Sequence, residues 1–169
     1  MDTVTVVTLL LVVATLWLVY VTRQLTLETR EGSRRQIGVQ TWLSFVDRLD
    51  SNEMKRARKK LAALLVNYDQ TKHGKVNEVV LEFFEDVGTT YELGFLDRKL
   101  ADSTFSYYVT HWWEAARAYV DQERRNMGGD KTDDYFGYFQ RLAETLRYCD
   151  IDDEAVQSFL KEEGRLSAD

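Results

Sequence analysis

The first apolar segment of the chain runs from Thr3 to Thr22 and contains no charged residue. Only threonines interrupt it, and a threonine hydroxyl in a helix can donate to the carbonyl one turn back. Twenty helical residues span the ~30 Å hydrocarbon layer of a bilayer. A cleaved signal peptide would start with positive charge and have a shorter apolar run, and a buried core helix would be polar on one face. The pattern therefore predicts a retained transmembrane anchor over residues 1–22.

After this segment, apolar residues recur at the three- and four-residue spacing of amphipathic helices. The pattern predicts a basic juxtamembrane stalk helix over residues 23–50, with a weak point at Gly32-Ser33, and a cytoplasmic helical domain over residues 51–169. The helices expected within that domain cover residues 52–68, 76–93, 97–126, 135–146 and 153–163. The loop between the first two covers residues 69–75, and a turn covers residues 127–130.

Several polar residues and one glycine lie where helix ends are expected. Ser51 and Asp97 are N-cap candidates, and Asp133 or Asp134 is a third. Gly94 is expected just beyond a helix C-terminus, where positive φ is common. The chain also contains no proline, the main breaker of helices. The predicted fold class is all-α: a single N-terminal transmembrane helix followed by a compact bundle of about five or six amphipathic helices.

Charge on either side of the apolar segment predicts how it is oriented. Only Asp2 lies before the segment, and Arg23, Arg30, Arg34 and Arg35 follow it. Basic flanks stay in the cytoplasm, so we expect the N-terminus outside and the helical domain inside the cytoplasmic (inner) membrane of the cell. Membrane lipid around residues 3–22 is the expected environment of the anchor.

The net charge of −6 conceals two parts of opposite sign. Residues 23–75 hold twelve Lys and Arg against six Asp and Glu, and residues 76–169 hold ten against twenty-one. The acidic part argues against nucleic-acid binding, since phosphate would be repelled. The basic part includes a cluster in the helix expected over residues 52–68. Its members are Lys55, Arg56, Arg58, Lys59 and Lys60.

Two interpretations of this basic cluster remain open. It is either the solvated face of a helix that packs through Ala57, Leu61, Leu64 and Leu65, or a contact for anionic lipid or an acidic partner. Arg23, Arg30, Arg34 and Arg35 belong to the same candidate contact.

Candidate chemistry is sparse. His111 and Glu114 lie three residues apart on one expected helix, and Glu82 and Glu85 lie on its neighbour. Di-iron bundles use a Glu-x-x-His motif twice, whereas here the order is reversed and occurs once. The other histidine, His73, lies in an expected surface loop. We therefore predict no catalytic residue, metal or cofactor, and a metal-dependent carboxylate enzyme is the alternative.

Three further residues are candidates for a core position or a partner contact. Trp112 fits the apolar stripe of its helix and is expected in the core. Trp113 lies beside that stripe and is a candidate half-exposed partner contact. Cys149 is alone, so it forms no intrachain disulfide, which suits a reducing compartment. It is expected to be a small core residue.

Residues 80–125 resemble an uncharacterised family of small bacterial proteins with one N-terminal membrane helix and a helical cytoplasmic domain. The shared pattern is an apolar helix with Phe-Phe-Glu at 83–85, Gly-Phe-Leu-Asp at 94–97, and a tryptophan-bearing helix that closes with Arg124 and Arg125. The family carries no assigned activity. The resemblance therefore implies a bacterial source and a fold type, and transfers no functional residue.

Together these patterns predict a membrane-anchored protein-interaction module, an adaptor or accessory subunit without enzymatic activity. Its expected partner is another protein or a second copy of the chain. A sensor of anionic lipid surfaces is the second alternative, through the basic residues between Arg23 and Lys60.

Overall fold

The computed structural model describes residues 2–66, 68, 77–128, 135–147 and 151–165, except for the side chains of residues 4–10, 12–13 and 25–35. These residues form six α-helices, and the chain divides into two compact units, residues 1–38 and 39–169. The predictions for the loop at 69–75, His73, Asp133, Asp134 and Cys149 fall outside the described residues. The helices are α1 (Thr3–Asp50), α2 (Asn52–Leu65), α3 (Val79–Glu92), α4 (Arg98–Met127), α5 (Gly137–Leu146) and α6 (Asp153–Glu163).

The predicted transmembrane anchor was wrong. A helix does form over the apolar segment, but over the described residues no helix combines the length and the apolarity that crossing a bilayer requires. The predicted orientation and the inner-membrane location depended on that anchor and are corrected with it.

Helix α1 is longer than the predicted elements. It continues through Gly32-Ser33, the expected weak point, and ends at Asp50. The boundary between the two compact units falls between Gly38 and Val39 along the chain, whereas the sequence pattern placed boundaries after residues 22 and 50.

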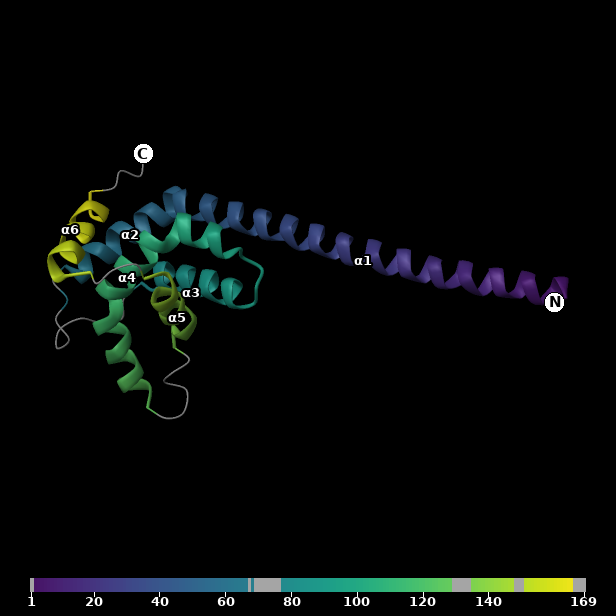
Figure 1. Ribbon diagram of the computed structural model, residues 1–169. Coiled ribbons are helices and arrows are strands. Elements are labelled where there is room, and N and C mark those ends of the chain that lie inside the picture. The colour runs from purple at the N-terminus through teal and green to yellow at the C-terminus, as the bar shows by residue number, and fades with distance from the viewer. Residues whose placement is uncertain (1, 67, 69–76, 129–134, 148–150, 166–169) are drawn as a thin grey trace. The chain divides into compact units, whose positions relative to one another are not determined.

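The all-α prediction for the domain agrees with the described residues. In the unit of residues 39–169, α3 packs against α5, α4 packs against α5, and α2 packs against both α3 and α6 (Figure 1). Apolar faces at helical spacing meet in one core, as the sequence pattern indicated. Burial of each large side chain stabilises the fold by about 1.5–3 kcal/mol. The largest fully buried aromatic side chains are Phe83, Phe84, Phe105, Trp112, Tyr119 and Phe139.

Side-chain capping marks where α2 and α4 begin. Ser51 accepts a hydrogen bond from the Met54 N–H, and Asp97 accepts from the first turn of α4, so both predicted N-caps are confirmed. Gly94 has a φ of 73°, as expected for the residue that follows α3. Helix α5 differs: Phe136 at its start has a φ of 55° and makes no side-chain cap. A residue of α3, described below, takes that role.

Candidate functional site

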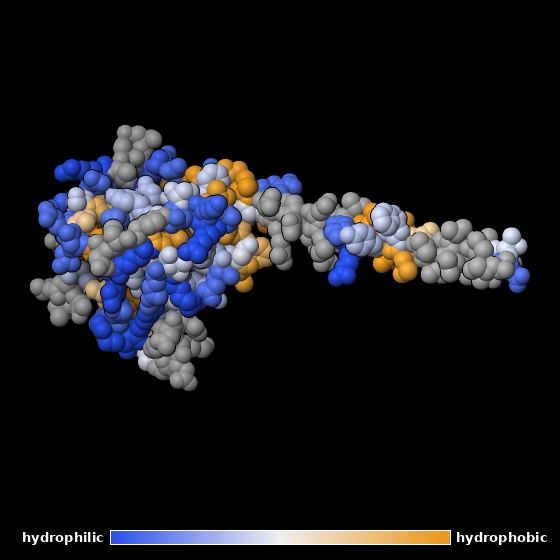
Figure 2. Space-filling view, viewed as in Figure 1, coloured by the Kyte–Doolittle hydropathy of each residue, from blue (hydrophilic) through white to orange (hydrophobic). Residues whose placement is uncertain are grey.

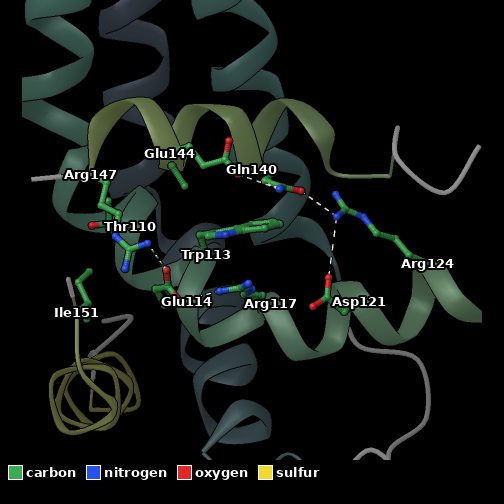
Figure 3. Close-up of a pocket in the computed structure, with 11 residues that line it drawn as sticks. Thr110, Trp113, Glu114, Arg117, Asp121, Arg124, Gln140, Glu144, Arg147 and Ile151 are labelled. Atoms are coloured by element: carbon green, nitrogen blue, oxygen red, sulfur yellow. Dashed lines mark hydrogen bonds and ion pairs between the residues drawn. The ribbon is translucent and has the colours of Figure 1, made fainter. Parts of the chain in front are cut away.

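A polar pocket of about 210 Å³ lies between α4 and α5 (Figure 3). Helix α4 provides residues from four successive turns, and α5 with the residue after it provides the opposite side. Three arginines and three carboxylates line it, so their formal charges cancel. The lining residues are Thr110, Trp113, Glu114, Arg117, Asp121, Arg124, Gln140, Ala143, Glu144, Arg147 and Ile151.

Trp113 lines this pocket and is only 6% exposed. Its ring packs edge-on against Phe139 of α5, with 5.3 Å between ring centroids. The expectation that Trp113 is half exposed was therefore wrong, because α5 covers the flank of α4 next to the apolar stripe. Trp112 is fully buried, as predicted.

Arg124 holds one end of the pocket together. Its Nε and Nη2 donate to the Tyr135 carbonyl at 3.1 and 2.9 Å, and its Nη1 donates to Gln140 Oε1 at 2.8 Å. The guanidinium also lies 5.9 Å from the centre of the Trp113 ring, a cation–π distance. These contacts join α4 to the start of α5, which gives Arg124 a structural role.

Glu114 is at the other end, between two further arginines. Arg147 Nη1 lies 3.6 Å from Glu114 Oε1, and Arg117 Nη1 lies 3.9 Å from Glu114 Oε2. Charge-assisted N–H···O bonds are about 2.7–2.9 Å long, so both ion pairs are loose. The side chain of Glu114 is 19% exposed, whereas those of Arg117 and Arg147 are 60% and 40% exposed. This end of the pocket is thus a two-arginine carboxylate site that faces solvent.

The structure does not bring together the four residues of the alternative metal site, which are Glu82, Glu85, His111 and Glu114. His111 Nδ1 lies 2.7 Å from the Tyr107 carbonyl oxygen, and the His111 ring packs against Phe159 of α6. Glu82 is exposed, and Glu114 faces arginines. Across the described part of the chain, no three His, Cys, Asp or Glu side chains are grouped as metal ligands would be.

Glu85 has a different role, which the sequence did not indicate. Its carboxylate accepts the Phe139 N–H at 2.6 Å and the Tyr138 N–H at 3.2 Å, so α3 supplies the N-terminal cap of α5. Burial raises the pKa of Glu85, and the two backbone N–H groups and Arg141 oppose that rise in part.

The basic cluster of α2 divides into exposed and buried members. Arg56, Lys59 and Lys60 are exposed and Lys55 is partly exposed. Arg58 is 3% exposed, and its Nε lies 2.9 Å from Glu163 Oε2 of α6. Arg58 is therefore not available to lipid or to an acidic partner. Of the four arginines near the start of the chain, Arg23 is exposed and the side chains of Arg30, Arg34 and Arg35 are outside the description.

A second polar cluster was also missed. The hydroxyls of Tyr119 and Tyr135 each donate to Glu78 Oε1 at 2.5 Å. Burial, followed by the hydrogen bond to Glu78, raises the pKa of both tyrosines far above the usual value of 10.0. The hydrogen bonds join residues 41 and 57 positions apart, so no local spacing could have shown them.

Comparison with known families now places the chain. Residues 4–161 match the family described as a domain of unknown function, DUF4760. The chain belongs to the DUF4760 family. The resemblance to an uncharacterised family is thereby confirmed, whereas the membrane helix and the bacterial source that it implied gain no support. No curated protein and no solved structure matches the chain.

Proposed function

We propose that this DUF4760 protein is a protein-interaction module that associates with another protein chain through helix α1. The observation that carries the proposal is the exposure of every side chain from Ala14 to Tyr20. The large apolar ones among them are between 56% and 67% exposed (Figure 2). They are Leu16, Trp17, Leu18, Val19 and Tyr20.

This stretch surrounds the helix instead of forming one stripe. Successive residues are 100° apart, so seven of them cover the whole circumference. Monomeric proteins rarely expose contiguous apolar surface of this kind, which is typical of a surface that a partner covers. Thr15, within the stretch, and Thr22, just after it, do not make this surface polar. Their hydroxyls donate to the carbonyls of Leu11 and Leu18 in the same helix.

The test compares two double substitutions on α1 in the full-length chain. Leu16→Glu with Val19→Glu places charge in the apolar stretch. Gln36→Glu with Gln40→Glu adds the same charge at two exposed polar positions of the same helix. We expect chemical crosslinking in cells, followed by mass determination of the purified complex, to capture a partner with the wild type and the glutamine variant. The Leu16→Glu/Val19→Glu protein should lose most of the crosslinked partner.

A second copy of the chain and a different protein are both partners that mass determination identifies. Recovery of the wild type solely as a monomer, with no crosslinked species in cells, would contradict the proposal. Equal loss of crosslinks in both variants would also contradict it, because charge alone would then be the cause.

The second alternative, a contact with an anionic surface through the basic residues between Arg23 and Lys60, remains a proposal without Arg58. In α2 it retains Arg56, Lys59 and Lys60, which are exposed, and Lys55, which is partly exposed. Flotation of the chain with anionic and neutral vesicles at two salt concentrations tests it. Binding that depends neither on the charge of the vesicles nor on the salt concentration would contradict that alternative.

A further inference from the structure

We propose that the pocket between α4 and α5 binds a small organic monocarboxylate through Arg117 and Arg147, in the place now taken by the carboxylate of Glu114. This inference does not depend on the role of α1. It rests on the loose ion pairs of Glu114, the composition of the pocket and its size.

The ion pairs of Glu114 show that the two arginines bind a carboxylate. Both guanidiniums approach one carboxylate, one at each oxygen, yet at 3.6 and 3.9 Å neither ion pair is as short as a charge-assisted hydrogen bond. Glu114 is held on α4 together with Arg117, only three residues away. A free carboxylate is not tied to the helix in this way, and it can adopt the planar, two-point geometry that arginine prefers.

Charge in the pocket favours a ligand with a single negative charge. Asp121 and Glu144 lie along the same walls as Arg124 and Gln140 (Figure 3). A phosphate dianion would meet their repulsion in addition to that of Glu114. A monocarboxylate has half the charge of the dianion, so it meets about half that repulsion when it displaces Glu114 from the two arginines.

The rest of the lining favours a small, partly apolar body. The volume of about 210 Å³ corresponds to about seven waters at ~30 Å³ each in the liquid. Most of the lining is polar, including the side-chain amide of Gln140, and Trp113, Ala143 and Ile151 contribute the smaller apolar part. A ring of benzoate size carrying one carboxylate matches this combination.

The experiment titrates benzoate into the full-length protein and follows binding by calorimetry, with inorganic phosphate as the second probe. We expect Glu114→Gln to bind benzoate about tenfold more tightly than the wild type, because the internal competitor loses its charge. Arg147→Gln should bind it about tenfold more weakly. The matched control is Arg125→Gln, an exposed arginine of the same helix outside the pocket, and its affinity should equal that of the wild type.

Three results would overturn the proposal. One is the lack of saturable benzoate binding by both the wild type and Glu114→Gln at millimolar concentrations. Another is phosphate binding as tightly as benzoate. The third is an affinity that Glu114→Gln leaves unchanged. Since Glu114→Gln is expected to gain affinity, loss of folding cannot imitate the result, and thermal unfolding of each variant checks that Arg147→Gln remains folded.

Discussion

In two helix pairs of this domain a carboxylate joins the helices, half-buried in one pair and buried in the other, and the two carboxylates are compensated differently. Between α3 and α5, the carboxylate of Glu85 accepts two backbone N–H groups from the start of α5. Between α2 and α6, Arg58 and Glu163 form an ion pair with side chains only 4% and 7% exposed. The first charge is compensated by the end of a helix, and the second by an opposite charge.

The two arrangements also differ in how completely their polar atoms are satisfied. Both oxygens of Glu85 receive hydrogen bonds. In the other pair, Arg58 Nη1 makes no hydrogen bond, and the 2.9 Å contact of Nε with Glu163 Oε2 lacks hydrogen-bond geometry. The Arg58 guanidinium also lies over the Tyr108 ring at 5.2 Å. Desolvation of such a pair can exceed its attraction, so we expect the α2–α6 ion pair to add little net stability.

Removing one member of the ion pair should have the largest effect on stability. Arg58→Ala leaves Glu163 buried without its partner and should lower the free energy of unfolding by about 3–5 kcal/mol. Arg56→Ala, at an exposed position of the same helix, is the control and should change it by less than about 0.5 kcal/mol. Urea unfolding of the two proteins measures the difference.

Replacing both members of the ion pair distinguishes the attraction between the two charges from the cost of burying them. Arg58→Met with Glu163→Met removes both charges and keeps apolar volume, so we expect a stability close to that of the wild type or above it. A double variant as unstable as Arg58→Ala would show that the pair itself stabilises the fold.

The contact of α3 with α5 depends on a glycine as well as on Glu85. A Cβ at Gly88 would lie 2.5 Å from the backbone oxygen of Tyr138, which cannot move aside as a side chain can. Gly88→Ala should therefore lower the free energy of unfolding by about 1–3 kcal/mol. At Gly137 of α5 a Cβ would meet only the end of the Arg141 side chain, at 3.3 Å. Gly137→Ala is the matched control, and thermal unfolding should show little loss or a gain.

A smaller effect is expected when the cap of α5 is removed. Glu85→Ala leaves the N–H groups of Tyr138 and Phe139 without their acceptor, which costs about 0.5–2 kcal/mol for a helix N-cap. Hydrogen exchange of these two amides should accelerate more than exchange in α6. Uniform acceleration throughout the domain would mean that Glu85 supports the whole core instead of one helix end.

Local features of the sequence predicted much of the fold. Ser51, Asp97 and Gly94 mark helix ends through interactions within one turn, and these were found at the predicted positions. The bounds of α6 were also predicted, since Asp153–Glu163 is a short helix with one apolar side. The transmembrane anchor was predicted from a charge-free run of twenty residues, and over the described residues no helix has the length and apolarity that crossing a bilayer requires.

Contacts between distant residues could not be predicted in the same way. Arg58 lies in a run of basic residues, and nothing in that run shows that its partner is Glu163, more than a hundred positions later. Glu85 and Trp113 were assigned by the pattern of their own helices, and α5 changed the environment of both. The pocket at Glu114 joins α4 to Arg147, so its residues share no motif.

The smallest predicted effect is on the pH dependence of stability, through the half-buried carboxyl of Glu85 and the buried carboxyl of Glu163. Burial raises the pKa of Glu85 and Glu163 above 4.5, more than their neighbours lower it. A raised pKa means that the folded state binds more protons than the unfolded state just above pH 4.5, so each group adds stability as the pH falls through its folded pKa. Glu85→Gln lacks this contribution. The stability advantage of the wild type over Glu85→Gln should therefore be larger near about pH 5 than near about pH 7. Urea unfolding at both values measures it, and an advantage that shrinks toward the lower pH would show that the two N–H groups, and not burial, dominate at Glu85.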